Sequence, residues 1–192
     1  MSAEKQPINL STPNERLAFT AESILSLGPM GNNIRGDDYQ AFLDRTFGVG
    51  RLLRSKATSC AIFIGGCLID SGVKAKRGWP AVMGIVTWIG VGWFGSEPSW
   101  IPADELNEPI RGDIPYWCSD QGKMGEYVWT RWEMAANGHV GTLTIGAGPI
   151  WYTAEGGGSP GGTVCRLSSK PKNIQKHYER KLRGVWRPNL MV

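Results

Sequence analysis

Cys60 is the residue whose type and position best suit covalent chemistry. It lies at the start of an apolar segment, 58–71, that the pattern predicts to be a buried helix. Backbone amides in the first turn of a helix have no partner within it, and the positive end of the helix dipole favours a thiolate. The same amides can hold an oxyanion during acyl transfer. The alternative interpretation is a buried structural cysteine. The preceding Ser59 either supports the thiol and the oxyanion or caps the helix.

His139 is the histidine best placed to act on that thiol. It opens a predicted strand, 139–145, directly after the turn residues Asn137 and Gly138. A histidine held at a strand end can take the proton from Cys60 and later return it to a leaving amine. The second histidine, His177, stands in the basic stretch KNIQKHYERK and is predicted to lie on a solvated helix.

The order of four short motifs resembles a known group of enzymes. TSCAIFIGGCL surrounds Cys60, RGDIPYW surrounds Asp113, NGHVGTLTIG surrounds His139, and IWYTAEGG contains Glu155. Over residues 50–168 this order is similar to that of the papain-like cell-wall amidases and endopeptidases, the NlpC-type and CHAP families. Each motif is short, so the specificity lies in their order and spacing.

That resemblance implies roles for three residues. The cysteine would attack an amide of the peptidoglycan stem peptide, and His139 would be the general base. A third polar residue on the following strand would orient the imidazole; Glu155 is the candidate, with Thr153 as the alternative two residues earlier. Gly156 stands where the CHAP pattern has Asn. For Asp113 we expect a turn residue at the start of a strand rather than a catalytic role.

The elements that must position these residues form an α+β pattern. Thr12, Pro13 and Glu15 predict the start of a helix that stops at Gly28, and a shorter helix is predicted over 37–47. Strands are predicted over 114–118, 126–132, 139–145, 150–154 and 163–167, and the tail over 173–183 as a helix, with a last strand at 185–186 as the alternative. The resemblance implies a papain-like (NlpC/CHAP) fold, in which N-terminal helices, including the one with the nucleophile, pack on a five- to six-stranded antiparallel sheet. We expect one catalytic domain over 1–192, with 1–35 as a helical extension and 36–192 as the papain-like core.

The composition of the chain excludes two kinds of structure. The chain of 192 residues is 41% hydrophobic, which argues against disorder, and its 26 Gly and 12 Pro argue against a helical bundle. The cysteines at 60, 67, 118 and 165 form no CxxC pair and their spacing does not resemble a zinc site. Because the chemistry of a cysteine hydrolase needs neither a metal nor an organic cofactor, we expect none. Cys60 and Cys67 lie too far apart on one predicted helix to form a disulfide, whereas pairing of Cys118 with Cys165 is left open.

The tryptophans should lie mostly in the core, with one or two along a groove. The ones considered are Trp79, Trp88, Trp93, Trp100, Trp117, Trp129, Trp132 and Trp151.

Two features bear on partners and location. Segment 78–96 is uncharged and long enough to span a bilayer, but Pro80 and five glycines favour a buried helix followed by a loop. Residues 1–15 contain no apolar stretch typical of a Sec signal. The net charge of +4 suits an anionic partner, yet no basic groove interleaved with aromatic residues indicates nucleic-acid binding.

The sequence therefore predicts a cysteine hydrolase that cleaves the peptidoglycan stem peptide through an acyl-enzyme. By family analogy we expect an antibacterial effector of a type VI secretion system, made in the cytoplasm and acting in the periplasm or cell wall of a target bacterium. Such an effector would have an immunity protein and a component of the secretion machine as partners. The alternatives are a phage-type endolysin, a papain-like acyltransferase or protein-modifying enzyme, and, outside enzymes, a membrane-active binding protein that uses 78–96.

Overall fold

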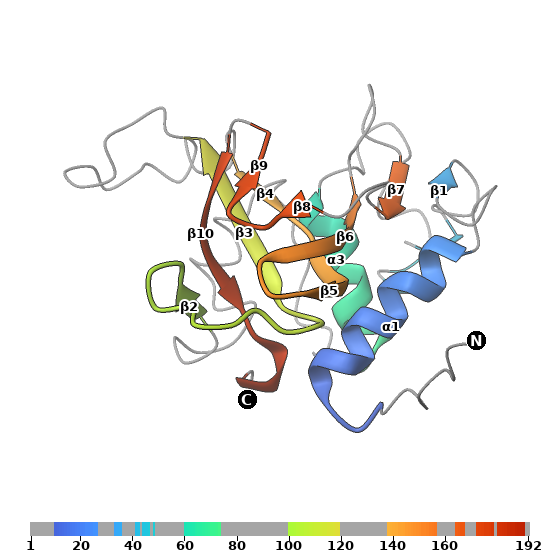
Figure 1. Cartoon of the computed structure of the whole chain (residues 1–192). Coiled ribbons are helices and arrows are strands. Elements are labelled where there is room, and N and C mark those ends of the chain that lie inside the picture. Colours follow the sequence, from blue (N-terminus) through green and yellow to red (C-terminus); the bar gives the residue numbers. More distant parts are fainter. Residues whose placement is uncertain are drawn as a thin grey trace, which may run out of the picture.

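The residues that the structure describes have an α+β fold in which two antiparallel sheets pack beside the helices Pro13–Ser26 and Cys60–Asp70 (Figure 1). The computed structural model describes residues 10–26, 33–35, 41–42, 44–46, 48, 60–73, 100–119, 138–156, 164–167, 172–178 and 180–190. The elements are α1 (Pro13–Ser26), β1 (Asn33–Arg35), α3 (Cys60–Asp70), β2 (Trp100–Pro102), β3 (Ile114–Ser119), β4 (Gly138–Val140), β5 (Thr142–Ala147), β6 (Ile150–Gly156), β7 (Val164–Leu167), β8 (Lys172–Asn173), β9 (Lys176–His177), β10 (Arg180–Trp186) and the short 3₁₀ helix η3 (Pro188–Leu190).

Helix α1 begins where the sequence predicts it. The Thr12 hydroxyl accepts a hydrogen bond from the Glu15 amide at 3.2 Å, which satisfies one of the unpaired amides of the first turn. Its apolar face buries Leu17, Ala21 and Ile24 in the main core together with residues of α3. The N-terminal segment predicted as an extension thus contributes directly to that core. Of the helix predicted over 37–47, residues 41–42 and 44–46 are helical.

Helix α3 is the central buried helix that the sequence predicts. Residues 63–68 are all buried, and the ring of Phe42 packs so closely on Gly66 that an added Cβ would lie 2.5 Å from its Cζ. The helix ends in a Schellman turn: the Val73 amide donates to the Leu68 carbonyl, and Gly72 adopts a φ of +69°. The glycine at 72 therefore ends the helix because it can adopt the left-handed conformation without strain.

The described strands form two five-stranded sheets rather than the single sheet expected. One sheet has the order β1-β7-β6-β5, with β8 paired to β6, and the other has the order β2-β10-β3-β4, with β9 paired to β10. All these pairings are antiparallel. The strand predicted over 139–145 is divided at Gly141, where the chain leaves β4 in one sheet and enters β5 in the other.

The C-terminal region corrects the prediction of a helix over 173–183. Residues of this region form β8, β9 and β10, and Val185 and Trp186 end a strand of seven residues, as the alternative proposed. Tyr178 has a φ of +53°, which interrupts any helix, and β10 is paired along its length with β3. The other strands predicted in the described residues are present as β3, β6 and β7, whereas 126–132 lies outside the described residues.

Tryptophans contribute to both hydrophobic clusters. Trp186 belongs to the cluster around α1 and α3, whereas Trp117 and Trp151 belong to a second cluster with Ile174 and Val185. Trp100 is partly buried against the first cluster. The other tryptophans singled out, at 79, 88, 93, 129 and 132, lie outside the described residues, as does segment 78–96. Among the residues that the structure describes, no helix is both long and apolar enough to cross a membrane.

Candidate active site

Cys60 is the first residue of α3 and is half-buried. It packs against the main core, so its position is fixed by the buried helix that carries it. Cys67, two turns further along the same helix, is fully buried, and neither cysteine is in a disulfide. The second candidate at this helix start, Ser59, lies outside the described residues.

His139 lies on β4, where its backbone is in register with Trp117 of β3. Its ring stacks on the Trp117 indole with centroids 5.9 Å apart, and the side chain is 13% exposed. Burial lowers the pKa of the ring, but the charge of Cys60 and hydrogen bonds to Cys60 and Glu155 outweigh it and raise the pKa to about 9. The structure therefore places the thiol and the imidazole of the two predicted residues in contact.

Glu155 lies on β6 and supplies the carboxylate of the site. Its Oε2 is 3.1 Å from Nε2 of His139, while the Thr153 hydroxyl and the Lys172 ammonium both contact Oε1. Of the two candidates for the orienting residue, Glu155 thus contacts the ring, and Thr153 holds the carboxylate. Burial would raise the pKa of Glu155, but hydrogen bonds from His139 and His177 and the charges of His139 and Lys172 hold it well below its usual range.

Gly141 has a steric role behind this carboxylate. It stands at the crossing between β4 and β5, and a Cβ built there would lie 3.0 Å from Cγ of Glu155 and 3.1 Å from the carbonyl oxygen of Ala154. A side chain at this position would therefore press on the Glu155 side chain. Because Gly141 has no side chain, it leaves the space that the Glu155 carboxylate occupies.

His177 corrects the sequence interpretation. It is not on a solvated helix: it lies on β9, is 4% exposed, and its Nε2 is 2.9 Å from the same Oε2 of Glu155. Its ring is 4.3 Å from that of His139 and 4.9 Å from that of Trp117, measured between centroids. Burial lowers its pKa, the Glu155 carboxylate offsets this in part, and the charges of His139 and Lys172 lower the pKa further.

A local signal pointed towards this arrangement. The Gln175 amide donates to the Asn173 side chain at 2.9 Å, which is an Asx turn, and Ile174 between them is fully buried. An Asn that opens such a turn interrupts a helix, and here the turn takes the chain from β8 in one sheet to β9 in the other. Lys172, on the other side of this turn, reaches Glu155 and also lies over the Trp117 ring, 5.3 Å from its centroid.

The ligand atoms of His139, Glu155 and His177 lie within 4.8 Å of one another, a spacing that a metal ion can also use. The carboxylate at the centre of the cluster is already paired with the ammonium of Lys172, whose positive charge opposes a second cation there. The two short contacts to Oε2 are those of hydrogen bonds from imidazoles. These contacts therefore favour hydrogen bonds between the three residues over coordination of a metal ion.

Asp113 lies apart from this chemistry, in agreement with its prediction as a turn residue. It is fully buried, its Oδ2 accepts the Ile110 amide at 3.0 Å, and Arg187 contacts both of its oxygens at 2.9 and 2.7 Å. Asn14 of α1 donates to Oδ1 at 3.2 Å. The carboxylate thus ties the C-terminal segment and α1 to the start of β3.

The structure also bears on the pairing of Cys118 with Cys165 that the sequence left open. Cys118 on β3 is buried and free, so a bridge with Cys165 is not formed. Their strands belong to different sheets, since β7, which contains Cys165, pairs with β1 and β6.

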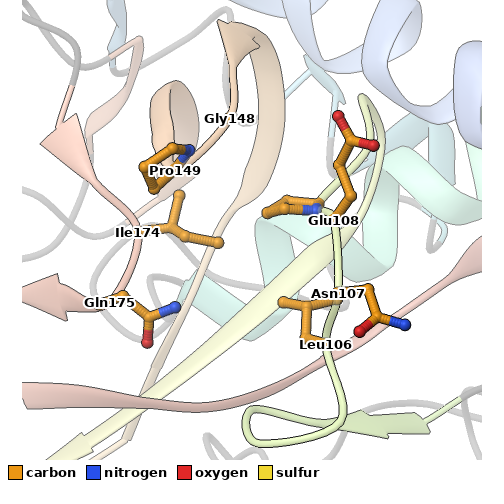
Figure 2. Close-up of a pocket in the computed structure, with 8 residues that line it drawn as sticks. Leu106, Asn107, Glu108, Gly148, Pro149, Ile174 and Gln175 are labelled. Carbon is orange, nitrogen blue, oxygen red and sulfur yellow. The ribbon is translucent and has the colours of Figure 1, made fainter.

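A surface pocket of about 320 Å³ lies near the β8–β9 turn. Figure 2 shows Pro149, Ile174 and Gln175 on one side of it and Leu106 and Glu108 on the other. None of the residues in contact with Glu155 lines it. The pocket is therefore distinct from the cluster of Cys60 and the two histidines.

Comparisons with protein-family models, with curated proteins and with solved structures found no match for this chain. The geometry of Cys60, His139 and Glu155 therefore carries the functional proposal. A thiol, an imidazole and a buried carboxylate in this arrangement are suited to acyl transfer.

Proposed function

We propose that this protein is a cysteine amidohydrolase that cleaves an amide bond of the peptidoglycan stem peptide. One observation carries the proposal: the His139 ring contacts Cys60 and also places its Nε2 3.1 Å from Glu155. A thiol, an imidazole and a buried carboxylate in this order are the parts of a nucleophile, a base and its orienting group. The nucleophile opens a buried helix, and the base and the carboxylate come from strands, which also supports a papain-like fold.

The reaction begins from a charge pair between Cys60 and His139. Because the pKa of His139 is about 9, the ring is an imidazolium at neutral pH, and its positive charge stabilises the Cys60 thiolate beside it. The thiolate attacks the amide carbonyl carbon and forms a C–S bond, while negative charge moves to the carbonyl oxygen. Backbone amides in the first turn of a helix have no acceptor within the helix, so those of α3 are the donors that this oxyanion would meet.

The tetrahedral intermediate then breaks down by acid catalysis. His139 gives its proton to the leaving nitrogen, the C–N bond breaks, and an amine leaves the acyl-enzyme. The neutral His139 next takes a proton from water, whose oxygen attacks the thioester carbonyl carbon and releases a carboxylic acid and the Cys60 thiolate. Glu155 keeps the ring aligned and stabilises its charged form in both halves of the reaction.

The substrate class is supported by the motif order and by charge. The motifs around Cys60, His139 and Glu155 are similar in order to those of enzymes that act on bacterial cell walls, and the net charge of +4 favours an anionic polymer. We infer an antibacterial role, in which the protein is delivered to the cell wall of a target bacterium by a secretion machine. The producing cell would then hold an immunity protein against it.

Digestion of purified peptidoglycan tests the proposal. Wild type, Cys60→Ala and the control Cys67→Ala, which changes a buried thiol in the same helix, are compared with released fragments identified by mass spectrometry. We expect Cys60→Ala to lose at least about 10³-fold in rate with an unchanged melting temperature, and Cys67→Ala to keep its rate. The digestions contain a chelator, which should not reduce cleavage.

Two results would overturn the proposal. One is a folded wild type that releases no fragments from walls of several chemistries. The other is a Cys60→Ala variant that cleaves as fast as the wild type. Fragment masses that show a new amide in place of a free acid would assign the site to acyl transfer instead of hydrolysis.

A further inference from the structure

His177 makes a contact that the proposed chemistry does not use. Its Nε2 and that of His139 approach one and the same atom, Oε2 of Glu155, at 2.9 and 3.1 Å. The ring is 4% exposed and lies against Trp117, so its position is fixed by packing. A second buried imidazole on the carboxylate of a catalytic pair changes how strongly that carboxylate can hold the first one.

The two oxygens of Glu155 have different tasks. Oε1 is held by the Thr153 hydroxyl and by the Lys172 ammonium, which together fix the orientation of the carboxylate. Oε2 is shared between the two histidines. A carboxylate oxygen divides its negative charge among its donors, so each histidine weakens the bond of the other.

The protonation state of His177 follows from the groups that face it. Glu155 of β6 favours the charged ring, while Lys172 of β8 and His139 of β4 oppose it; the exposed Tyr178 contacts its edge, and Arg180 is opposite in the strand register. With burial, these charges lower the pKa of His177, so the ring is neutral at neutral pH. Its Nδ1 is buried without a hydrogen-bond partner among the described residues, which suits the tautomer with the proton on Nε2.

We propose that His177 is a positioning residue that moderates the Glu155–His139 hydrogen bond and so sets how readily His139 gives its proton to the leaving amine. The inference rests on the proposed function of Cys60 and His139. A neutral donor on Oε2 takes up part of the negative charge that would otherwise act on His139 alone. The proton of His139 is thereby held less tightly than by an unshared carboxylate.

The consequence of removing this donor has a definite sign. In His177→Phe the ring volume remains, and Oε1 still fixes Glu155 through Thr153 and Lys172. The full charge of Oε2 then acts on His139, whose pKa rises above its value of about 9. A weaker acid protonates the leaving amine more slowly, so kcat falls while KM is unchanged. Activity that depends on the imidazolium is lost as the pH rises through the pKa of His139. In His177→Phe the fall of kcat on the alkaline side of the pH–activity profile therefore moves to higher pH.

Nuclear magnetic resonance of the full chain measures the effect directly. The chain has two histidines, so in His177→Phe the ring signals belong to His139 alone. We expect the pKa of His139 to rise by about one unit and kcat on peptidoglycan fragments to fall up to about tenfold at pH 7. In His177→Gln the amide restores a donor near the position of Nε2, so the pKa of His139 should return to within about 0.3 unit of wild type and kcat to within about twofold.

Two controls separate this role from a structural one. Tyr178→Phe changes the exposed neighbour and should move neither value. His177→Asn is polar but too short to place a donor at Oε2, so it should behave like His177→Phe and serves as the second variant if the latter does not fold. An unchanged pKa of His139 in a folded donor-less variant, or a Gln variant that behaves like Phe, would overturn the inference. The titration needs no substrate, so it remains decisive even if the wild type cleaves no peptidoglycan.

Discussion

Two carboxylates, Asp113 and Glu155, are almost completely buried, and each receives four hydrogen bonds from described residues. Asp113 is bound by Arg187 through two nitrogens, by the Asn14 side chain and by the Ile110 amide. Glu155 is bound by a hydroxyl, an ammonium and two imidazoles. Both carboxylates therefore meet the requirement that a buried charge be paired and hydrogen-bonded.

The difference lies in the donors. A guanidinium, an amide side chain and a backbone N–H keep their protons at every pH in which the protein folds, so the Asp113 network can only hold segments together. The imidazoles on Glu155 can gain and lose protons: the pKa of His139, which contacts Cys60, is raised to about 9, and that of His177 is lowered by burial. The kind of donor, rather than burial of the carboxylate, therefore distinguishes a hydrogen-bond network that only holds segments together from one whose protons can move.

The largest effect should come from Glu155→Gln. An amide cannot stabilise the imidazolium of His139, and its NH₂ group can turn towards the ring and favour the wrong tautomer. We expect kcat on peptidoglycan fragments to fall about 10³- to 10⁴-fold with the fold retained by circular dichroism. Glu108→Gln, which changes an exposed carboxylate at the pocket of Figure 2, is the matched control and should keep its rate. Equal rates for the two variants would remove Glu155 from the mechanism.

The opposite pattern is expected for Asp113→Asn. The change leaves Arg187 without its buried partner, so unfolding by urea should show a loss of about 3 kcal/mol. The kcat of the protein that remains folded should equal that of the wild type. Arg45→Met, which breaks the exposed pair of Arg45 and Asp70, should cost less than about 1 kcal/mol. A fall in kcat larger than the loss of folded protein would mean that the two carboxylate networks are coupled.

A smaller effect is expected from Gly141→Ala. Its Cβ would lie 3.0 Å from Cγ of Glu155, so the carboxylate must shift by a few tenths of an ångström. We expect kcat to fall about tenfold and stability by about 1 kcal/mol. Gly72→Ala, where φ is +69° and the space for Cβ is open, should lose similar stability but keep its kcat. If both alanine variants retain full kcat, the glycine at 141 has no part in placing Glu155.

Sequence patterns were sufficient to predict the elements that contain Cys60 and His139. The apolar run after Cys60 predicts α3, and the glycine punctuation around His139 predicts a strand start; the structure has both. The capping residues of α1 predict its start to the residue. These signals are local, since each depends on residues within one or two turns of the chain.

The second histidine could not be found in the same way. Strands β8 and β9 have two residues each, too few to show an alternation of polar and apolar side chains. His177 is buried because distant residues, Trp117 and Glu155, cover it. The division into two sheets was missed for a related reason: Gly141 is where the chain changes partners, and pairing of strands far apart in sequence decides that change.

The crossing at Gly141 also has a consequence for the geometry of the site. His139 belongs to the sheet of β3 and β10, whereas Glu155 belongs to the sheet of β5 and β7, so their alignment depends on how the two sheets meet. Any change in how the two sheets meet would therefore change the distance between His139 and Glu155 without moving Cys60, which lies on α3.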